Sequence, residues 1–374
     1  TTNDSSGTDA DVTIDGGTTA LDIAASTIDG DLTLTSGNAS GITDSGTVTV
    51  GGNFSATTDA NNGVINVGTM AVDGTVALTT NGNGAATIVN DAGLSFAAST
   101  VGGALSATAT TGNITDTGAL AITGTTTLVT SANDATITLD NASNAFTGAM
   151  TITTNDASGT DADVTIDGGT TALDIAASTI DGDLTLTSGN ASGITDSGTV
   201  TVGGNFSATT DAGNGVINVG SMAIDGTAAL NTHGSGNATI VNDAGLSLAA
   251  STVGGTFSGT ATTGNITDSG ALAITGTTTL VTSADNATIT LDTTTNAFTG
   301  AMTITTNDSS GTDADVTIDG GTTALVIAAS TIDGDLTLTS DNASGITDSG
   351  TVTVGGNFSA TTGANNGVIN MGSM

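Results

Sequence analysis

Residues 28–34 read Ile-Asp-Gly-Asp-Leu-Thr-Leu, and this pattern, a glycine between apolar residues two positions apart, decides the fold. Side chains two apart on an extended chain share a face, so the pattern predicts a β-strand with one buried side. The glycine occupies one of the alternate positions that face the interior. We expect glycine there where a strand bends at a corner without room for a side chain. The first copy of the pattern holds six such glycines: Gly30, Gly52, Gly74, Gly103, Gly124 and Gly148.

The whole sequence returns at a fixed offset. Asp11 recurs as Asp163 and Asp315, 152 residues apart each time. A fixed period signals a repeat architecture, in which short coils bury their interior only by stacking on one another. We therefore predict an all-β parallel β-helix (β-solenoid), one continuous rod of repeat 1 (1–152), repeat 2 (153–304) and a partial repeat 3 (305–374).

The glycine spacings predict the number of coils. From Gly30 to Gly182 they are 22, 22, 29, 21, 24 and 34 residues, which indicates about six coils per copy. The two long intervals are expected to hold bulges or loops. With about 4.8 Å between strands of neighbouring coils, one copy would advance about 29 Å.

Apolar residues of the alternating stretches are the predicted core. The Ile, Leu, Val and Met residues would form a continuous column inside the coils. The widest gaps are assigned to the phenylalanines: Phe54, Phe96, Phe146, Phe206, Phe257, Phe298 and Phe358.

The charge is entirely acidic. All 36 acidic residues are Asp, Lys and Arg are absent, and the net charge is −36. Without a basic patch the chain is not expected to bind nucleic acid or an anionic membrane surface. No apolar stretch reaches the length of a membrane span, so membrane insertion is not expected either. No signal-peptide pattern occurs within these residues, so any targeting signal is expected to lie outside them.

The densest Asp cluster is the candidate metal site. Calcium takes several oxygen ligands, and Asp side chains two apart on a strand face the same way. The candidate ligands are Asp9, Asp11, Asp15, Asp161, Asp163, Asp167, Asp313, Asp315 and Asp319. Asp29 and Asp31 are a weaker pair. The alternative is that Asp caps turns and keeps the chain soluble.

Two further observations concern function. Thr-x-Thr pairs with outward side chains, such as Thr33-Leu34-Thr35, suggest ice binding. The alternative is that Thr is the polar residue best suited to the solvent-exposed face of a strand. His233, the only His, replaces Asn81 of the first copy, which is more typical of a surface substitution than of a catalytic base. No constellation breaks the repeat as an active site would, so the protein is not expected to be an enzyme.

Two strings resemble the repeats of filamentous-haemagglutinin-type exoproteins, which are two-partner-secreted adhesins. They are residues 41–54 (Gly-Ile-Thr-Asp-Ser-Gly-Thr-Val-Thr-Val-Gly-Gly-Asn-Phe) and 144–150 (Asn-Ala-Phe-Thr-Gly-Ala-Met). The resemblance implies a right-handed parallel β-helix, export to the cell surface and a role as an adhesin shaft. The family's amino-terminal secretion domain is not seen in these residues.

The leading hypothesis is an extracellular or cell-surface structural protein that forms a filament or an adhesin shaft. Its expected partners are further copies of itself, head to tail or side by side, and a cell surface or another cell. No cofactor is required on this hypothesis. The alternative is a binding module whose Thr or Asp ladders bind ice or Ca²⁺.

Overall fold

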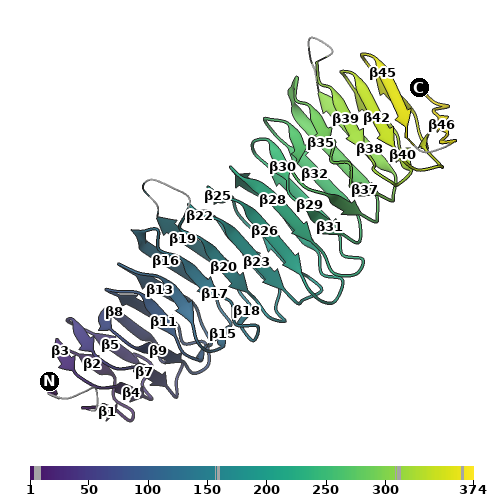
Figure 1. Ribbon diagram of the computed structural model, residues 1–374. Helices are drawn as coiled ribbons and strands as arrows, with labels where there is room; N and C mark the ends of the chain where they lie inside the picture. Colours follow the sequence, from purple (N-terminus) through teal and green to yellow (C-terminus); the bar gives the residue numbers. More distant parts are fainter. Residues whose placement is uncertain (4–9, 156, 158–160, 308, 310–312, 364–365) are drawn as a thin grey trace. The chain divides into compact units, whose positions relative to one another are not determined.

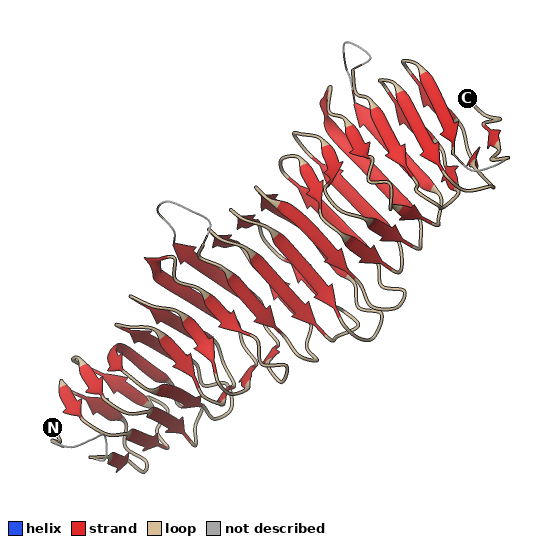
Figure 2. Ribbon diagram, viewed as in Figure 1, coloured by secondary structure: helices blue, strands red, loops and turns tan. Residues whose placement is uncertain are grey.

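The structure is a computed structural model of the chain and describes residues 1–3, 10–155, 157, 161–307, 309, 313–363 and 366–374. These residues form strands and connecting loops, with no helix among them (Figure 2). The chain divides into two compact units, Thr1–Ser188 (unit 1) and Gly189–Met374 (unit 2). Each is a parallel β-solenoid (Figure 1), so the predicted fold class is confirmed.

In unit 1 the chain alternates between two sheets, sheet A and sheet B, and contributes to both in every coil. The sheet A strands are β1 (Val12–Asp15), β4 (Leu32–Ser36), β7 (Phe54–Thr58), β9 (Thr75–Thr79), β11 (Leu94–Phe96), β12 (Ser99–Val101), β14 (Ile114–Asp116), β15 (Leu120–Ile122), β17 (Ile137–Leu139), β18 (Ala145–Phe146), β20 (Val164–Asp167) and β23 (Leu184–Ser188). The sheet B strands are β2 (Leu21–Ile23), β3 (Ser26–Ile28), β5 (Ile42–Asp44), β6 (Val48–Val50), β8 (Ile65–Val72), β10 (Ala86–Asn90), β13 (Leu105–Ala109), β16 (Thr126–Asn133), β19 (Met150–Asn155), β21 (Leu173–Ile175) and β22 (Ser178–Ile180).

Unit 2 has the same two-sheet construction. Its sheet A strands are β26 (Phe206–Thr210), β28 (Thr227–Asn231), β30 (Leu246–Leu248), β31 (Ser251–Val253), β33 (Ile266–Asp268), β34 (Leu272–Ile274), β36 (Ile289–Leu291), β37 (Ala297–Phe298), β39 (Val316–Asp319), β42 (Leu336–Ser340) and β45 (Phe358–Thr362). Its sheet B strands are β24 (Ile194–Asp196), β25 (Val200–Val202), β27 (Ile217–Ile224), β29 (Ala238–Asn242), β32 (Phe257–Ala261), β35 (Thr278–Asp285), β38 (Met302–Asn307), β40 (Leu325–Ile327), β41 (Ser330–Ile332), β43 (Ile346–Asp348), β44 (Val352–Val354) and β46 (Ile369–Asn370).

The core lies between the two sheets of each unit. In β4, Leu32 and Leu34 are buried while the threonines between and after them are half-buried on the outside. Leu32, Leu34 and Phe54 of sheet A and Val48, Val67 and Met70 of sheet B line the same interior space. The predicted Phe positions are buried in six cases, whereas Phe358 in β45 is half-buried.

Glycines at the corners let consecutive coils touch backbone to backbone. The Gly52 N–H donates to the Gly30 carbonyl at 3.0 Å, and the Gly74 N–H donates to the Gly52 carbonyl at 3.0 Å. A Cβ added at Gly74 would lie 2.5 Å from the Gly52 carbonyl oxygen, well inside van der Waals contact. The corner therefore needs glycine because the preceding coil occupies the space of a side chain.

The six glycines of the sequence pattern form two such columns in unit 1, at different corners. The first (Gly30, Gly52, Gly74) leads into sheet A strands β4, β7 and β9, and the second (Gly103, Gly124, Gly148) leads into sheet B strands β13, β16 and β19. The interval from Gly74 to Gly103 is thus a coil and a half that crosses from one corner to the other. The interval does hold a loop, residues 80–85 between β9 and β10, but its extra length comes from the additional half coil.

This crossing changes the number of coils. Seven pairings lead from β1 to β20 along sheet A, so a 152-residue copy makes seven coils instead of the predicted six. The glycine series has six intervals because two of them, 74–103 and 148–182, each cover one and a half coils. At about 4.8 Å per coil, a copy advances about 34 Å.

Each copy also contains an internal repeat that places similar sequences on opposite sheets. Residues 23–27 (Ile-Ala-Ala-Ser-Thr) belong to β2 and β3 of sheet B, and residues 96–100 (Phe-Ala-Ala-Ser-Thr) belong to β11 and β12 of sheet A. The same exchange relates Ile42-Thr43-Asp44 in β5 to Ile114-Thr115-Asp116 in β14. Half a copy therefore advances three and a half coils and presents its outward side chains on the other face.

Candidate functional site

The Asp residues proposed as metal ligands accept backbone hydrogen bonds. The carboxylate of Asp11 accepts the Asp31 N–H at 2.8 Å, as Asp163 accepts the Asp183 N–H and Asp315 the Asp335 N–H. Each of these bonds joins one coil to the next at a corner. They favour the capping role of Asp over an ion-binding role.

The third position of each candidate cluster closes a local turn. Asp15 accepts the Gly17 N–H at 2.8 Å. Gly17 has a φ of +56°, a left-handed conformation that glycine tolerates and other residues rarely adopt. The same bond recurs at Asp167 and Asp319.

The candidate ligands do not converge within the described residues. Asp11 precedes β1 and Asp15 is its last residue, so the two lie about 13 Å apart at the usual rise of a strand. Asp161 and Asp313 are exposed, and Asp9 lies outside the described residues. Where the structure describes the chain, no three His, Cys, Asp or Glu side chains form a group that could hold a metal ion. Calcium binding stays a prediction.

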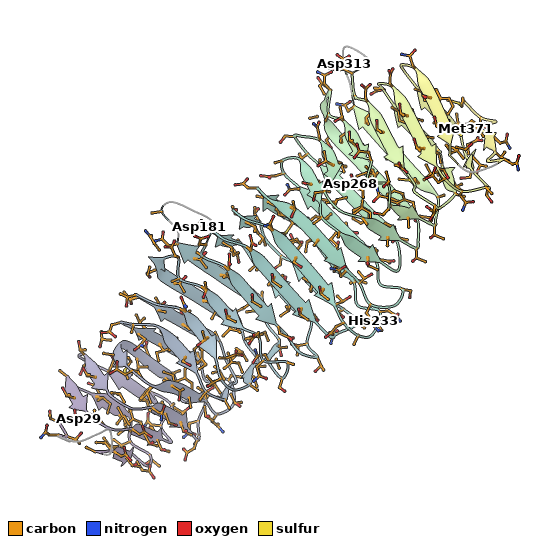
Figure 3. The ribbon with its side chains drawn as sticks, in the orientation of Figure 1. Asp29, Asp181, His233, Asp268, Asp313 and Met371 are labelled. Carbon is orange, nitrogen blue, oxygen red and sulfur yellow. The ribbon has the colours of Figure 1, made fainter. Side chains whose placement is uncertain are left out.

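Asp31 continues the corner contact along the first glycine column. Its carboxylate accepts the Asn53 N–H at 2.7 Å, and the Asn53 side-chain oxygen accepts the Thr75 N–H at 2.9 Å. Asp29, the other member of the weaker candidate pair, lies at the same corner (Figure 3). Asp31 therefore belongs to a ladder of side-chain caps.

The equivalent ladder in unit 2 affects a pKa. The Asn357 backbone N–H and then its side-chain amide donate to Asp335, and these bonds hold the pKa of the Asp335 carboxyl below its usual value. A carboxylate that accepts hydrogen bonds is favoured in its charged form.

A further set of Asp residues was missed by sequence reasoning. Asp44 accepts the N–H groups of Gly68 and Thr69, where β8 carries an extra residue relative to β10. Its counterpart in the internal repeat, Asp116, accepts the Asn144 side-chain amide at 2.7 Å. Asp268, labelled in Figure 3, makes the same contact in unit 2. The recurring Ile-Thr-Asp string was the available signal for these caps.

Outward side chains on the long strands form an uncharged surface. On β10, β13, β16 and β19 they lie in register in two rows across four coils. We call these eight residues the sheet B array: Thr87, Val89, Ser106, Thr108, Thr127, Val129, Thr151 and Thr153. Unit 2 has the same array at Thr239, Val241, Ser258, Thr260, Thr279, Val281, Thr303 and Thr305. No Asp occupies any of these positions.

The first half of the copy presents its counterpart on the other face. The sheet A array consists of outward residues of β1, β4, β7 and β9: Thr13, Asp15, Thr33, Thr35, Ser55, Thr57, Ala77 and Thr79. It differs from the sheet B array by one carboxylate, Asp15.

A notch of about 290 Å³ opens at a corner of unit 1 where the first glycine column ends. Gly74 packs on Gly52, whereas Gly93 of the next coil packs on Asn113. Asp73 and Ser95 are among its lining residues, and unit 2 has an equivalent notch of about 280 Å³ with Asp225 and Ser247. With one carboxylate each, the notches lack the charge density of a calcium site.

Two further residues, His233 and Asp174, have a clear structural setting. His233 is exposed on a turn (Figure 3), and its N–H donates to the Thr210 hydroxyl at 3.1 Å. Asp174, which corresponds to Val326 in the third copy, has one buried carboxylate oxygen without a hydrogen-bond partner among the described residues. Asp22 occupies this position in the first copy, on the outer side of β2.

Comparison with known proteins identifies the repeat. A family model described as repeats of unknown function (DUF5649) matches residues 9–65, 83–153, 161–218, 235–305 and 313–372. Two of these matches fall in each complete 152-residue copy, as the half-copy exchange between sheets requires. No curated protein and no solved structure matches the chain. In the part of the chain described, no helix is long and apolar enough to cross a membrane.

Proposed function

We propose that this chain, which belongs to the DUF5649 family of repeats, is an extracellular structural protein. Its β-solenoid forms the shaft of an adhesin or a filament. The observation that carries this proposal is the use of the polar side chains. In both units the Asp and Asn side chains at the corners bind the backbone of the neighbouring coil. Side chains whose hydrogen bonds join one coil to the next stabilise a long, stiff stack of coils.

The location outside the cell is supported by the sequence. The chain lacks Lys and Arg, so it offers no cleavage site to trypsin-like proteases. The strings at 41–54 and 144–150 resemble filamentous-haemagglutinin-type repeats, which supports a right-handed shaft exported to the cell surface. Expected partners are other copies of the chain and a cell surface.

Electron cryo-microscopy of the native material tests this proposal. We expect extended particles with a spacing of about 4.8 Å along the axis and a longer repeat of about 34 Å, one per seven coils. Labelling of intact cells with antibodies against the repeat should place it at the surface. Globular particles, or an antigen confined to the cell interior, would contradict the proposal. A parallel sample with a calcium chelator tests whether metal is needed for the stack.

A second candidate, ice binding, is favoured by one observation. The Thr-x-Thr steps have irregular spacing along the sequence, but strand pairing brings outward hydroxyl residues into register, as at Thr127 and Thr151. Thermal hysteresis of the purified chain would support this function, and its absence would leave the structural role.

A further inference from the structure

We propose that copies of the chain associate side by side, with the sheet B array of one copy packed against the sheet B array of another. The inference deepens the proposed structural function and rests on it. The occupant of this surface is thus a second copy of the same chain.

The charge of the chain selects this surface. With 36 Asp and no Lys or Arg, two copies repel each other wherever their carboxylates approach. The sheet B array has no carboxylate over four consecutive strands, and in unit 1 its strands contain no Asp at all. Like charges opposed across an interface disfavour binding, so a surface free of Asp is where two copies can meet at the lowest electrostatic cost.

The shape of the array suits sheet packing. The three pairings that build it run without a register shift through all eight positions. Its side chains are small, mostly β-branched and, except for exposed Thr153, half-buried by their neighbours. Val89 and Val129 supply apolar groups among the hydroxyls, and two sheets pack face to face at about 10 Å through side chains of this size.

The area of the array sets the strength of the contact. Four strands of about five residues cover about 330 Å². A stable interface buries about 800 Å² on each partner, so one array alone gives weak association. Repetition of the array strengthens the contact, because every further array that engages adds to the same complex. Salt should also strengthen it by screening the surrounding Asp charges.

Sedimentation velocity of the full 374-residue chain at low and high NaCl tests the proposal. We expect association that increases with protein concentration and with salt. Val129→Asp together with Val281→Asp should weaken it at least about tenfold, because each places like charges opposite each other in a desolvated contact. The matched control, Thr123→Asp with Thr275→Asp, adds the same charge at exposed corners outside the array and should change association less than about twofold.

Cross-linking provides a second measurement, since the chain has no cysteine of its own. Thr108→Cys lies within the array and should form a disulfide-linked dimer under mild oxidation, whereas Thr123→Cys should form far less. A wild-type chain that stays monomeric at every salt concentration, or equal loss in the array and control variants, would overturn the proposal. Thermal hysteresis that Val129→Asp abolishes in a monomeric chain would also overturn it and assign the surface to ice.

Circular dichroism of the same samples distinguishes failure of this inference from failure of the proposed structural function. A folded β-rich chain that never associates side by side contradicts the inference and leaves the shaft role intact. Loss of the β-solenoid in the wild type would instead contradict the proposed function.

Discussion

The two glycine columns of unit 1 solve the same packing problem with different flanking residues. Asp31, Asn53 and Thr75 follow the glycines of the first column, and Ala104, Thr125 and Ala149 follow those of the second. Both columns show the close backbone contact between coils, but the ladder of Asp and Asn caps accompanies the first. Both corners therefore require glycine, whereas the side-chain caps occur in addition to glycine at the first corner.

The largest effect is expected from filling a corner. In Gly124→Ala, the new Cβ would lie 2.5 Å from the carbonyl carbon of Gly103, so the coils must separate. We expect a loss of about 3 to 4 kcal/mol in the free energy of unfolding, measured by urea denaturation. Gly68→Ala is the matched control, because its Cβ meets nothing within 4 Å, and it should change stability by less than about 0.5 kcal/mol. Equal effects of the two variants would refute the backbone-contact explanation.

The crossing between the columns depends on a buried amide. Asn90 accepts the Val72 N–H at 2.8 Å and donates to the Val72 and Gly93 carbonyls at 3.1 and 2.7 Å. Asn90→Ala leaves buried backbone groups without partners and should cost about 2 to 3 kcal/mol in thermal or urea unfolding. Exposed Asn66→Ala should be nearly neutral, and a neutral Asn90→Ala would show that the amide is dispensable.

A cap can be added to the second column. Asn237 in unit 2 accepts the Thr256 N–H at 2.8 Å, whereas the equivalent residue of unit 1 is Ala85. Ala85→Asn should stabilise the chain by about 0.5 to 1 kcal/mol, and Asn237→Ala should destabilise it by a similar amount. Both are measured by urea unfolding. If neither variant changes stability, a cap at this corner of the second column contributes nothing.

The smallest effect is expected from the charge of a cap. The folded-state pKa of Asp335 is lowered by its bonds from Asn357, so its contribution to stability is present above the unfolded-state pKa and is lost as the pH falls through the folded-state pKa. Asp335→Asn should therefore make acid unfolding below about pH 4 less steep. Asp73→Asn is the comparison variant, and a steeper acid transition in Asp335→Asn would oppose the assigned pKa direction.

The core residues show how much of the fold could be predicted from the sequence. Leu32, Leu34 and Phe54 alternate with polar residues, and this alternation alone was enough to place them inside. The coil count was wrong because Gly74 and Gly103 look alike in sequence yet occupy different corners. The Asp11 and Asp15 candidates were chosen for parity, but parity cannot tell a converging pair from two caps at opposite ends of a strand.

The sequence by itself determined the β-solenoid class, the buried face of each strand and the repeat of 152 residues, because side-chain alternation and periodicity are properties of the chain order. The tertiary structure decided the seven coils, the two glycine columns and the exchange of similar sequences between sheets A and B. It also decided which backbone group each Asp binds, as when Asp11 caps Asp31. These features depend on which residues of successive coils lie opposite each other, and that register follows from stacking in three dimensions.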